Sequence, residues 1–511
     1  MTRLDDLSTG RPAGDDPDGT KPGSAPRTPA SSRVRPAHVA VALVFATALW
    51  LAVTPINDID SYWHVPIGRE ILARHTVDGL GTAWLGVPAD TWRTSQWLSE
   101  VVMALGVDHV GWGALTALRL LAGAALYLVL VLTLVRRRQP IAALVVVLGV
   151  VISVGGLLQD RPATLSLVFL ALLGPACERL WTTGSRPPVV AVAAAAVVWA
   201  QCHGLWILAP AAFALVAVGA LVDRGRAAPG QLRGALICAA ASCAGVVNPF
   251  GPSAFLLPLR FQSAAGVHIV EWLAPTFTSS LTIPWGILVL LLIFAWVRSP
   301  VRVPDTELIW TAAWTVFGLS AWRNVGPVVL LTAPVVLRAL ERSFTPVLEK
   351  MSAHPSRRVS RVLAGVVAVT VAVGVLGTVL TWYRVDPLKK TPALAIAQEL
   401  AGVPGQVRVY NGYNASGSLV AFGGGSSGHL LLVVDGRSDL WGNDHIQEVT
   451  DAQNLAPGWE GGFTAFHPDA VVMPDGTPLV MLLLGERHWN VLRRDGDYVL
   501  LVPPGSRLLR H

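Results

Sequence analysis

The chain has 511 residues, of which 52% are hydrophobic and only 14% are charged, and its mean hydropathy is +0.52. This composition is too apolar for a set of soluble domains, and it excludes the disordered and fibrous classes. The net charge of +6 does not indicate nucleic-acid binding, because no basic stripe with interleaved aromatic residues is present. The sequence therefore predicts a polytopic membrane protein without a nucleic-acid partner.

The N-terminal segment, residues 1–35, is rich in Pro, Gly, Ser and Asp and cannot bury a core. We expect it to be a disordered cytoplasmic tail. It lacks the small-residue cleavage site of a signal peptide, so the first apolar run, 37–55, is expected to stay as a membrane anchor. Arg27, Arg33 and Arg35 precede this run and place the N-terminus in the cytoplasm by the positive-inside rule.

Further apolar runs are long enough to cross about 30 Å of hydrocarbon as helices, which excludes a barrel of alternating strands. We predict a transmembrane helical bundle of about eleven spans over residues 36–382. The spans after the first are 112–135, 141–158, 163–180, two spans between 189 and 222, 232–247, 283–297, 307–319, 326–338 and 363–382. In this register Arg136-Arg137-Arg138 and most other arginine-rich turns lie inside, whereas the large first loop, 56–111, lies outside.

Most polar residues that interrupt the apolar sequence lie on the predicted outer side. They are Asp58, Asp60, His64, Asp160, Arg161, Gln201, His203, Asn248, Glu271, Arg323 and Asn324. Polar groups at membrane depth cost several kcal/mol each unless they are paired or hydrated. Their convergence on one face therefore indicates a site that faces away from the cytoplasm. The alternative is that they are ordinary loop residues and helix caps.

The C-terminal segment, residues 383–511, alternates helical and strand patterns and predicts a small extracytoplasmic α/β domain. We expect a helix at 392–400 and strands at 407–411, 430–434 and 470–473. A hairpin at 491–502 should turn at Asp495-Gly496. From Arg384 onward there are 10 Lys and Arg against 13 Asp and Glu, so the positive excess belongs to the membrane part.

The four cysteines are Cys177, Cys202, Cys238 and Cys243, and they lie in or beside apolar runs without paired spacing. This pattern supports neither a disulfide framework nor a zinc site. We interpret them as small buried apolar residues.

Asp58 and Asp60 follow the first span directly and are candidate catalytic residues. Residues two apart in an extended segment or turn point the same way, so these carboxylates are able to share a divalent cation or to form a proton donor and acceptor pair. Mutual repulsion would raise one pKa, which suits a general base. The alternative is an Asp that caps a helix over 63–73.

The predicted outer loops also contain aromatic and basic residues. Trp63, Trp84, Trp92, Trp97 and Trp112 all lie in or next to the first loop, and they suit either an interfacial belt or a lipid-linked substrate. Arg161 and Arg323 lie in short outer turns, where the positive-inside rule makes arginine less expected. With the nearby amides they are candidates to clamp a phosphate or pyrophosphate.

Several motifs occur in the order found in a family of bacterial multi-span proteins that resembles the GT-C class of membrane glycosyltransferases. They are Asp58-Ile-Asp60-Ser-Tyr-Trp63-His64, Arg161-Pro162, His203-Gly204, Asn248-Pro249-Phe250-Gly251, Glu271-Trp272 and Arg323-Asn324. Val434-Asp435-Gly436-Arg437-Ser438-Asp439-Leu440 resembles the outer domain of the same family. The resemblance covers nearly everything after Pro36.

The resemblance implies transfer of a sugar from a polyprenyl-phosphate donor to an extracytoplasmic glycan, lipid or protein acceptor of the cell envelope. Asp60 or Asp58 would deprotonate the acceptor hydroxyl in an inverting displacement. Substrate binding would fall to His64, Arg161, His203, Asn248, Glu271, Arg323 and Asn324. No nucleotide site is required, which agrees with the absence of a GxxxxGK loop.

One departure concerns a possible second acid. Family members carry His-Glu-Trp where this chain has Ser95-Gln96-Trp97. Glu100 is the candidate replacement, and loss of catalysis is the alternative. A metal requirement stays open, with a divalent cation at Asp58 and Asp60 as one option.

Two other classes of protein compete with the transferase. A non-catalytic scaffold or assembly factor for envelope polysaccharide would use the outer domain as a binding module. A secondary transporter should place its ionisable residues near mid-bilayer on broken helices. Because most such residues lie at one surface here, we rank the transferase first, the scaffold second and the transporter last. The protein is expected in the plasma membrane as a multi-pass protein with its C-terminal domain outside the cytoplasm.

Overall fold

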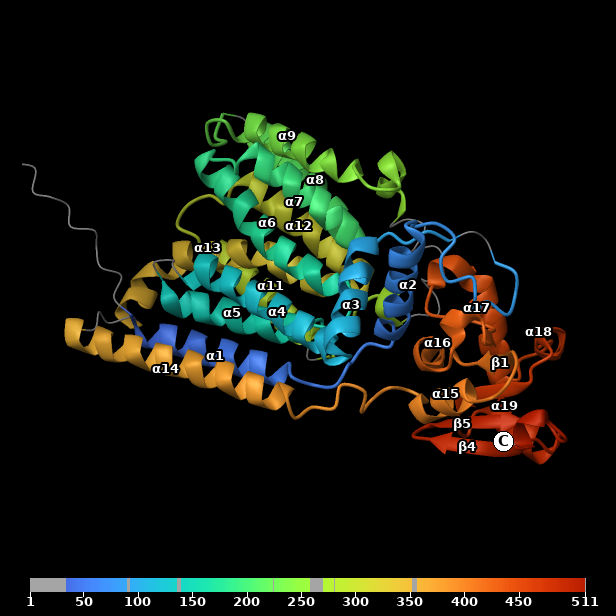
Figure 1. Ribbon diagram of the computed structural model, residues 1–511. Coiled ribbons are helices and arrows are strands. Elements are labelled where there is room, and N and C mark those ends of the chain that lie inside the picture. Colours follow the sequence, from blue (N-terminus) through green and yellow to red (C-terminus); the bar gives the residue numbers. More distant parts are fainter. Residues whose placement is uncertain are drawn as a thin grey trace, which may run out of the picture.

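The computed structural model describes residues 34–89, 92–135, 139–223, 225–257, 270–279, 281–351 and 356–510. The predictions for residues 1–33 and for Arg136, Arg137 and Arg138 lie outside the described residues. The described chain forms a helical bundle, a long loop with two helices, and a C-terminal domain that lies beyond one end of the bundle (Figure 1).

The bundle contains a helix at each of the predicted spans. Its helices are α1 (Pro36–Leu51), α4 (Gly113–Leu130), α5 (Pro140–Gly155), α6 (Ala163–Thr183), α7 (Val189–Cys202), α8 (Leu208–Asp223), α9 (Gln231–Ser242), α11 (Thr282–Val297), α12 (Asp305–Ser320), α13 (Val325–Met351) and α14 (Arg357–Trp382).

By length and composition, five helices among the described residues can cross a membrane. These are Gly113–Thr133, Ala163–Thr183, Gly204–Asp223, Trp322–Lys350 and Arg357–Trp382. Five further helices are apolar but shorter. The prediction of a multi-pass helical membrane protein is therefore confirmed, while the number of about eleven spans stays a prediction.

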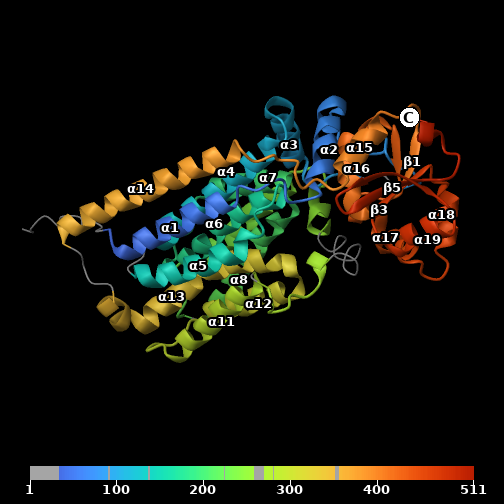
Figure 2. The same ribbon diagram turned by 90° about the horizontal axis from the view of Figure 1, so that it is seen from below.

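The bundle has a central helix and a peripheral pair. Residues 324–337 of α13 and its preceding turn are all buried, because α5, α6, α11 and α12 pack around them. In contrast, α14 lies along α1 at the side of the bundle (Figure 2). A methyl group at Gly374 of α14 would lie 2.5 Å from Ala46 Cβ, so the small residue allows the close approach of these two helices. Cys177, Cys202 and Cys238 are buried.

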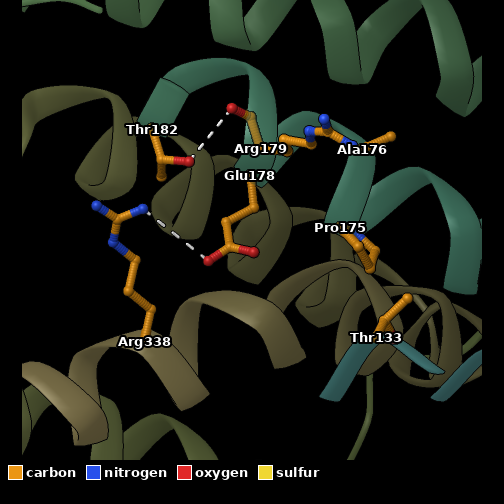
Figure 3. A pocket seen from close by; sticks show the side chains of 7 residues that line it. All are labelled: Thr133, Pro175, Ala176, Glu178, Arg179, Thr182 and Arg338. Carbon is orange, nitrogen blue, oxygen red and sulfur yellow. Dashed lines mark hydrogen bonds and ion pairs between the residues drawn. The ribbon is translucent and has the colours of Figure 1, made fainter. Parts of the chain in front are cut away.

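The far ends of α6 and α13 carry a second polar cluster (Figure 3). Arg338 lies 4.0 Å from the buried Glu178, and Thr182 donates to the carbonyl of Arg179 at 3.2 Å. These residues line an open pocket of about 430 Å³. They lie roughly 20 Å along each helix from the end that faces the C-terminal domain, at 1.5 Å per residue. The two ends of the bundle thus hold separate polar groups.

The loop 56–111, which the sequence predicts to lie outside and which is called the first outer loop here, folds into α2 (Ser61–Arg74) and α3 (Trp97–Val110). These helices lie between the bundle and the C-terminal domain (Figure 1). α2 contains Pro66 and is buried over most of its length. The carbonyl of Ile59 would lie 2.6 Å from a Cβ at Gly417 of the C-terminal domain. The loop is therefore in direct contact with that domain.

The C-terminal domain is a five-stranded mixed sheet with the order β2-β1-β3-β5-β4. Its strands are β1 (Val407–Asn411), β2 (Leu430–Leu432), β3 (Ala470–Pro474), β4 (Asn490–Asp495) and β5 (Tyr498–Val502). β1 pairs in parallel with β2 and β3, and β5 pairs antiparallel with β3 and β4. The predicted strands and hairpin are confirmed by these positions.

Helices cover both faces of this sheet. They are α15 (Leu394–Ala401), α16 (Ser416–Phe422), α17 (Ser438–Asn454), α18 (Glu460–Phe466) and α19 (Pro478–Gly485). Successive residues of a strand point to opposite faces, and Val472 and Val471 accordingly belong to two different apolar clusters. The Val472 cluster includes Ile67, Trp84 and Trp92 of the first outer loop. The core of the domain is therefore completed by residues from 56–111.

The first outer loop also covers the edge strand β2. The backbone N–H of Leu432 donates to the carbonyl of Trp84, and the N–H of Gly86 donates to the carbonyl of Leu432, both at 2.8 Å. An uncovered strand edge is a template for aggregation. The loop thus closes an edge that the segment 383–511 alone would leave open.

Candidate functional site

A cavity of about 580 Å³ lies where the helix ends nearest the C-terminal domain meet the first outer loop and that domain. Eight of the sequence-predicted site residues line it, namely Asp58, Asp60, His64, Arg161, His203, Glu271, Arg323 and Asn324. Two others, Glu100 and Asn248, are absent from the lining. The cavity is therefore assembled from connections that are far apart in the chain but share one end of the bundle.

The acidic loop is shaped by its own side chains. Asp58 Oδ1 accepts from the backbone N–H of Asp60 at 2.9 Å, which is an Asx turn. Asp60 Oδ1 accepts from Trp63 Nε1 at 3.0 Å. The side chain of Asp60 makes no capping hydrogen bond to α2, although Asp60 occupies the N-cap position. The capping role that was the alternative interpretation of this carboxylate is thus not observed for Asp60.

Arg161 lies among three carboxylates. Its Nη2 donates to both carboxylate oxygens of Glu271 at 2.9 and 3.0 Å. Its Nε lies 3.2 Å from Asp58 Oδ2, and its Nη1 lies 3.9 Å from Asp60 Oδ2. Burial would lower the pKa of Arg161, but the charges of these carboxylates raise it above its ordinary value. Arg161 is therefore a fixed cation that holds the acidic residues together.

The same contacts bear on a divalent cation shared by Asp58 and Asp60. Both oxygens of Asp58 are engaged, one by the Asp60 N–H and the other by Arg161. One oxygen of Asp60 is taken by Trp63. Among the described residues no group of three or more His, Cys, Asp or Glu could hold a metal ion. The guanidinium of Arg161 occupies the position that a bridging cation would need, so this arrangement does not fit one.

Asp60 has an altered acidity. Burial raises its pKa, and the charge of Asp58 raises it further, whereas Arg161, His64 and the Trp63 hydrogen bond lower it. The net result is a pKa of about 6. Its Oδ2 is the less engaged oxygen, because the nearest cation lies 3.9 Å away. Asp60 is thus a carboxylate that ionises near neutral pH, which is the property of a general base.

A buried ion pair fixes the two loops that carry these residues. Arg119 of α4 and Asp160 are both fully buried, and Arg119 Nη1 donates to Asp160 Oδ2 at 2.7 Å. The same Asp160 oxygen accepts from the backbone N–H of Asn57 at 3.0 Å, and the Asp160 carbonyl accepts from Ser61 Oγ at 2.7 Å. The loop that bears Arg161 is thereby tied to the loop that bears Asp58 and Asp60.

Glu100 lies behind the cavity wall rather than in it. Its Oε1 is 3.0 Å from His64 Nδ1, and the two side chains are 0% and 3% exposed, respectively. His64 itself lines the cavity. The structure thus makes Glu100 an orienting partner of His64, where the sequence had suggested a direct acid.

His203 and the two asparagines are held by local hydrogen bonds. His203 Nδ1 accepts from the backbone N–H of Leu205 at 3.3 Å and lies 3.0 Å from Ser166 Oγ. Asn324 Nδ2 donates to the Phe317 carbonyl at 3.2 Å. Asn248 Oδ1 accepts from the N–H of Phe250 at 2.7 Å, so this side chain shapes its own turn. Asn248 is the predicted binding residue that the structure places away from the cavity.

Arg323 differs from Arg161 in having no hydrogen-bond acceptor among the described residues. Its guanidinium stacks over Trp272, with 4.5 Å between Cζ and the ring centroid. The cavity lining also contains apolar side chains, called the apolar wall below. They are Leu205, Ile207, Leu208, Phe317 and Ala321. A cation that has no hydrogen-bond acceptor among the described residues, in a cavity with apolar lining residues, suits an anionic group that carries a long apolar chain.

The C-terminal domain supplies a wall that was not predicted. It consists of Tyr413, Asn414, Gly436, Arg437, Ser438 and Asp439. Burial raises the pKa of Asp439 to about 6, and its Oδ2 accepts from Trp92 Nε1 at 2.8 Å. The signal in the sequence was the Asp435 to Asp439 motif, which had been assigned to the outer domain without a role in the site.

Comparison with known proteins gives structural neighbours. No family model matches the chain, and no curated protein matches it. ArnT from Cupriavidus metallidurans, solved bound to undecaprenyl phosphate, is similar with 18% identity and a TM-score of 0.49, over 92% of this chain and 98% of that one. An Archaeoglobus fulgidus oligosaccharyltransferase tethered with an acceptor peptide is similar with 12% identity and a TM-score of 0.49, over 86% of this chain and 69% of that one. Both TM-scores lie below 0.5, so these likenesses assign neither a family nor a function to the chain.

Proposed function

We propose that the protein is a membrane glycosyltransferase that moves a sugar from a polyprenyl-phosphate donor to a hydroxyl acceptor outside the cytoplasm. The observation that carries the proposal is the content of one cavity. Asp60, a carboxylate with a pKa of about 6, lines it together with Arg323, a guanidinium without a hydrogen-bond acceptor among the described residues. A general base and a phosphate-binding cation are the two groups that such a transfer requires.

Donor binding falls to Arg323 and the apolar wall. The guanidinium offers paired N–H donors to a phosphate, and stacking on Trp272 fixes its plane. The first isoprene units would lie against the apolar side chains of η2 (Gly204–Ile207) and α12. Arg161 is not expected to bind phosphate directly, because its N–H groups already face Asp58, Asp60 and Glu271.

The chemical step is assigned to Asp60. Its Oδ2 takes the proton from the acceptor hydroxyl as the hydroxyl oxygen forms a bond to the anomeric carbon. The bond between that carbon and the phosphate oxygen breaks, and polyprenyl phosphate leaves with the electron pair. Inversion at the anomeric carbon follows from this single displacement. Envelope glycan, lipid and protein are the acceptor classes to be compared.

The test is transfer of radiolabelled sugar by the purified full chain in lipid nanodiscs. Polyprenyl-phosphate pentoses and hexoses serve as donors, and envelope glycan, lipid and peptide fractions serve as acceptors. Asp60→Asn should lower the rate by about 10²–10⁴-fold, because an amide keeps the shape but cannot take the proton. Asp386→Asn is the matched control, since Asp386 is exposed and its side chain accepts, within the described part of the chain, just the N–H of Leu388.

Binding of polyprenyl phosphate alone separates the roles. Asp60→Asn should bind this lipid with nearly unchanged affinity, whereas Arg323→Ala should bind it more weakly. Arg384→Ala, which removes an exposed arginine outside the cavity, should bind normally. Full transfer activity in Asp60→Asn, Asp58→Asn, Glu100→Gln and their triple combination would contradict the mechanism and favour the scaffold function.

A further inference from the structure

The loop Asp435–Asp439 of the C-terminal domain approaches the acidic residue of the cavity very closely. A Cβ at Gly436 would lie 2.3 Å from Trp63 Nε1 and 2.8 Å from Asp60 Oδ1. The backbone of Gly436 therefore packs directly against Trp63 Nε1 and Asp60 Oδ1, which are the donor and the acceptor of one hydrogen bond. No side chain larger than hydrogen fits at this position without a shift of one of the two partners.

We propose that Gly436 is a positioning residue, which acts with its loop to hold the Trp63 indole against the Asp60 carboxylate. This inference rests on the proposed function, since it assigns the C-terminal domain a part in the transfer step. It extends the active site across a contact between residues that are more than 370 positions apart in the chain.

Hydrogen bonds on both sides of Gly436 hold the Asp435–Asp439 loop in this position. Tyr413 Oη donates to the carbonyl of Gly436 at 2.8 Å. On the other side, the buried Arg437 donates to Asp435 Oδ2 from Nε at 2.9 Å and from Nη2 at 2.6 Å. Arg437 also donates to the carbonyls of Leu80 and Gly81 at 2.8 Å each. Gly436 is thus anchored both to its own domain and to the first outer loop.

The indole of Trp63 is confined on its other sides as well. Its ring centroid lies 3.7 Å from that of His64 and 6.1 Å from that of Trp92, the latter in an edge-to-face arrangement. Trp92 is itself held by its hydrogen bond to Asp439. With the indole enclosed, Asp60 Oδ1 has one fixed donor and Oδ2 is left toward Arg161. The orientation of the carboxylate therefore depends on the outer-domain loop.

A methyl group at position 436 should displace the indole and break its hydrogen bond to Asp60. Displacement of a reacting group by about 1 Å can cost roughly 100-fold in rate. We therefore expect Gly436→Ala to lower turnover at saturating donor by about 10- to 100-fold. The KM for the donor should change little, because Arg323 and the apolar wall are untouched.

The experiment compares four forms of the full chain in nanodiscs: Gly436→Ala, Trp63→Leu, the double variant, and Gly461→Ala. Gly461 is the matched control in the same domain, since a Cβ there meets no atom within 4 Å. Trp63→Leu removes the indole donor and lets the smaller side chain turn away from residue 436. The double variant should lose less turnover than the product of the two single losses, because the methyl group then has no indole to displace and meets only Asp60 Oδ1. The number of folded active sites is measured as the number of polyprenyl-phosphate binding sites, and turnover is expressed per binding site.

The outcomes separate this inference from the proposed function. Non-additive losses with an unchanged donor KM support it, because damage to folding alone would lower the number of binding sites and leave turnover per site intact. Turnover of Gly436→Ala equal to that of Gly461→Ala, or fully additive losses in the double variant, overturns this inference alone. Absence of any transfer by the unmodified chain overturns the proposed function and this inference with it.

Discussion

A buried ion pair, Asp435 with Arg437, lies at the contact between the C-terminal domain and the first outer loop. Both side chains are 1% exposed. Arg437 donates to the Asp435 carboxylate and to the carbonyls of Leu80 and Gly81. Arg437→Leu keeps a comparable apolar volume but leaves the carboxylate and both carbonyls without this partner.

The expected cost follows from the groups left behind. Removal of one partner from a buried ion pair typically costs about 3–5 kcal/mol. Trp84 and Trp441 still donate to Asp435 at 2.7 and 2.8 Å, so we expect the lower part of this range, about 3 kcal/mol. For a unit of this size, that corresponds to a decrease in Tm of roughly 10 °C.

Two measurements check this expectation. Thermal melting in nanodiscs, followed by tryptophan fluorescence, reports the overall loss. Hydrogen exchange reports whether the backbone N–H groups of Gly86 and Leu432 lose protection, since these bond the loop to the sheet edge. Arg507→Leu is the matched control, because Arg507 is exposed and also donates to two backbone carbonyls, those of Pro404 and Gln406. Its Tm should change by less than about 2 °C.

If the unpaired charge of Asp435 causes the decrease in Tm, a neutral residue at position 435 should reduce that decrease. The double variant Asp435→Asn with Arg437→Leu removes the unpaired charge and should recover part of the Tm. In Arg437→Leu alone, burial should raise the pKa of Asp435 in the folded state above its unfolded value. The deficit should therefore shrink as the pH falls through that raised value. If Arg437→Leu and Arg507→Leu have the same melting temperature at every pH, the proposed contribution of the Asp435–Arg437 ion pair to stability is refuted.

Three other measurements address the site and the topology. The transfer rate should fall about tenfold per pH unit below pH 6, because burial and Asp58 raise the pKa of Asp60 to about 6 and the base acts only when ionised. A transfer rate that does not change down to about pH 4.5 would contradict this role of Asp60. Arg323→Ala should weaken polyprenyl-phosphate binding by about 10- to 100-fold with an unchanged Tm. Arg161→Ala should instead lower the Tm, because three carboxylates lose their shared cation. Calorimetric titration of the lipid and thermal melting together distinguish the two variants. A reporter fused after His511 should be active only outside the cytoplasm, and cytoplasmic activity would overturn the positive-inside assignment.

The elements that depend on local chemistry were predictable from the sequence. A helix that crosses the bilayer must satisfy its backbone internally and must be apolar over a fixed length. Both requirements depend only on residues that are consecutive in the sequence. Each predicted span accordingly overlaps a helix. The hairpin of β4 and β5 likewise follows from Asp495-Gly496 between two apolar runs. By contrast α17 was not predicted, because it is largely polar and buries only Ile446, Val449 and Ala452 against a sheet formed elsewhere.

The gathering of the site residues was partly predictable for a topological reason. Helices that alternate in direction bring every second connection to the same end of the bundle. Counting spans was therefore enough to place Asp58, Arg161, His203 and Arg323 near one another, although they lie far apart in the chain. The structure brings all four to one cavity.

The roles of these residues were decided only by tertiary contacts. Arg161 and Arg323 have the same side chain and both lie in short turns between helices. Glu271, 110 residues from Arg161, accepts hydrogen bonds from Arg161, whereas Arg323 stacks on Trp272 and has no hydrogen-bond acceptor among the described residues. Gly436 carries no chemistry that a sequence pattern can reveal. Its importance arises because the folded chain brings its backbone against Trp63 and Asp60. Length and apolarity are properties of consecutive residues, whereas pairing and close approach are properties of the distances that folding sets.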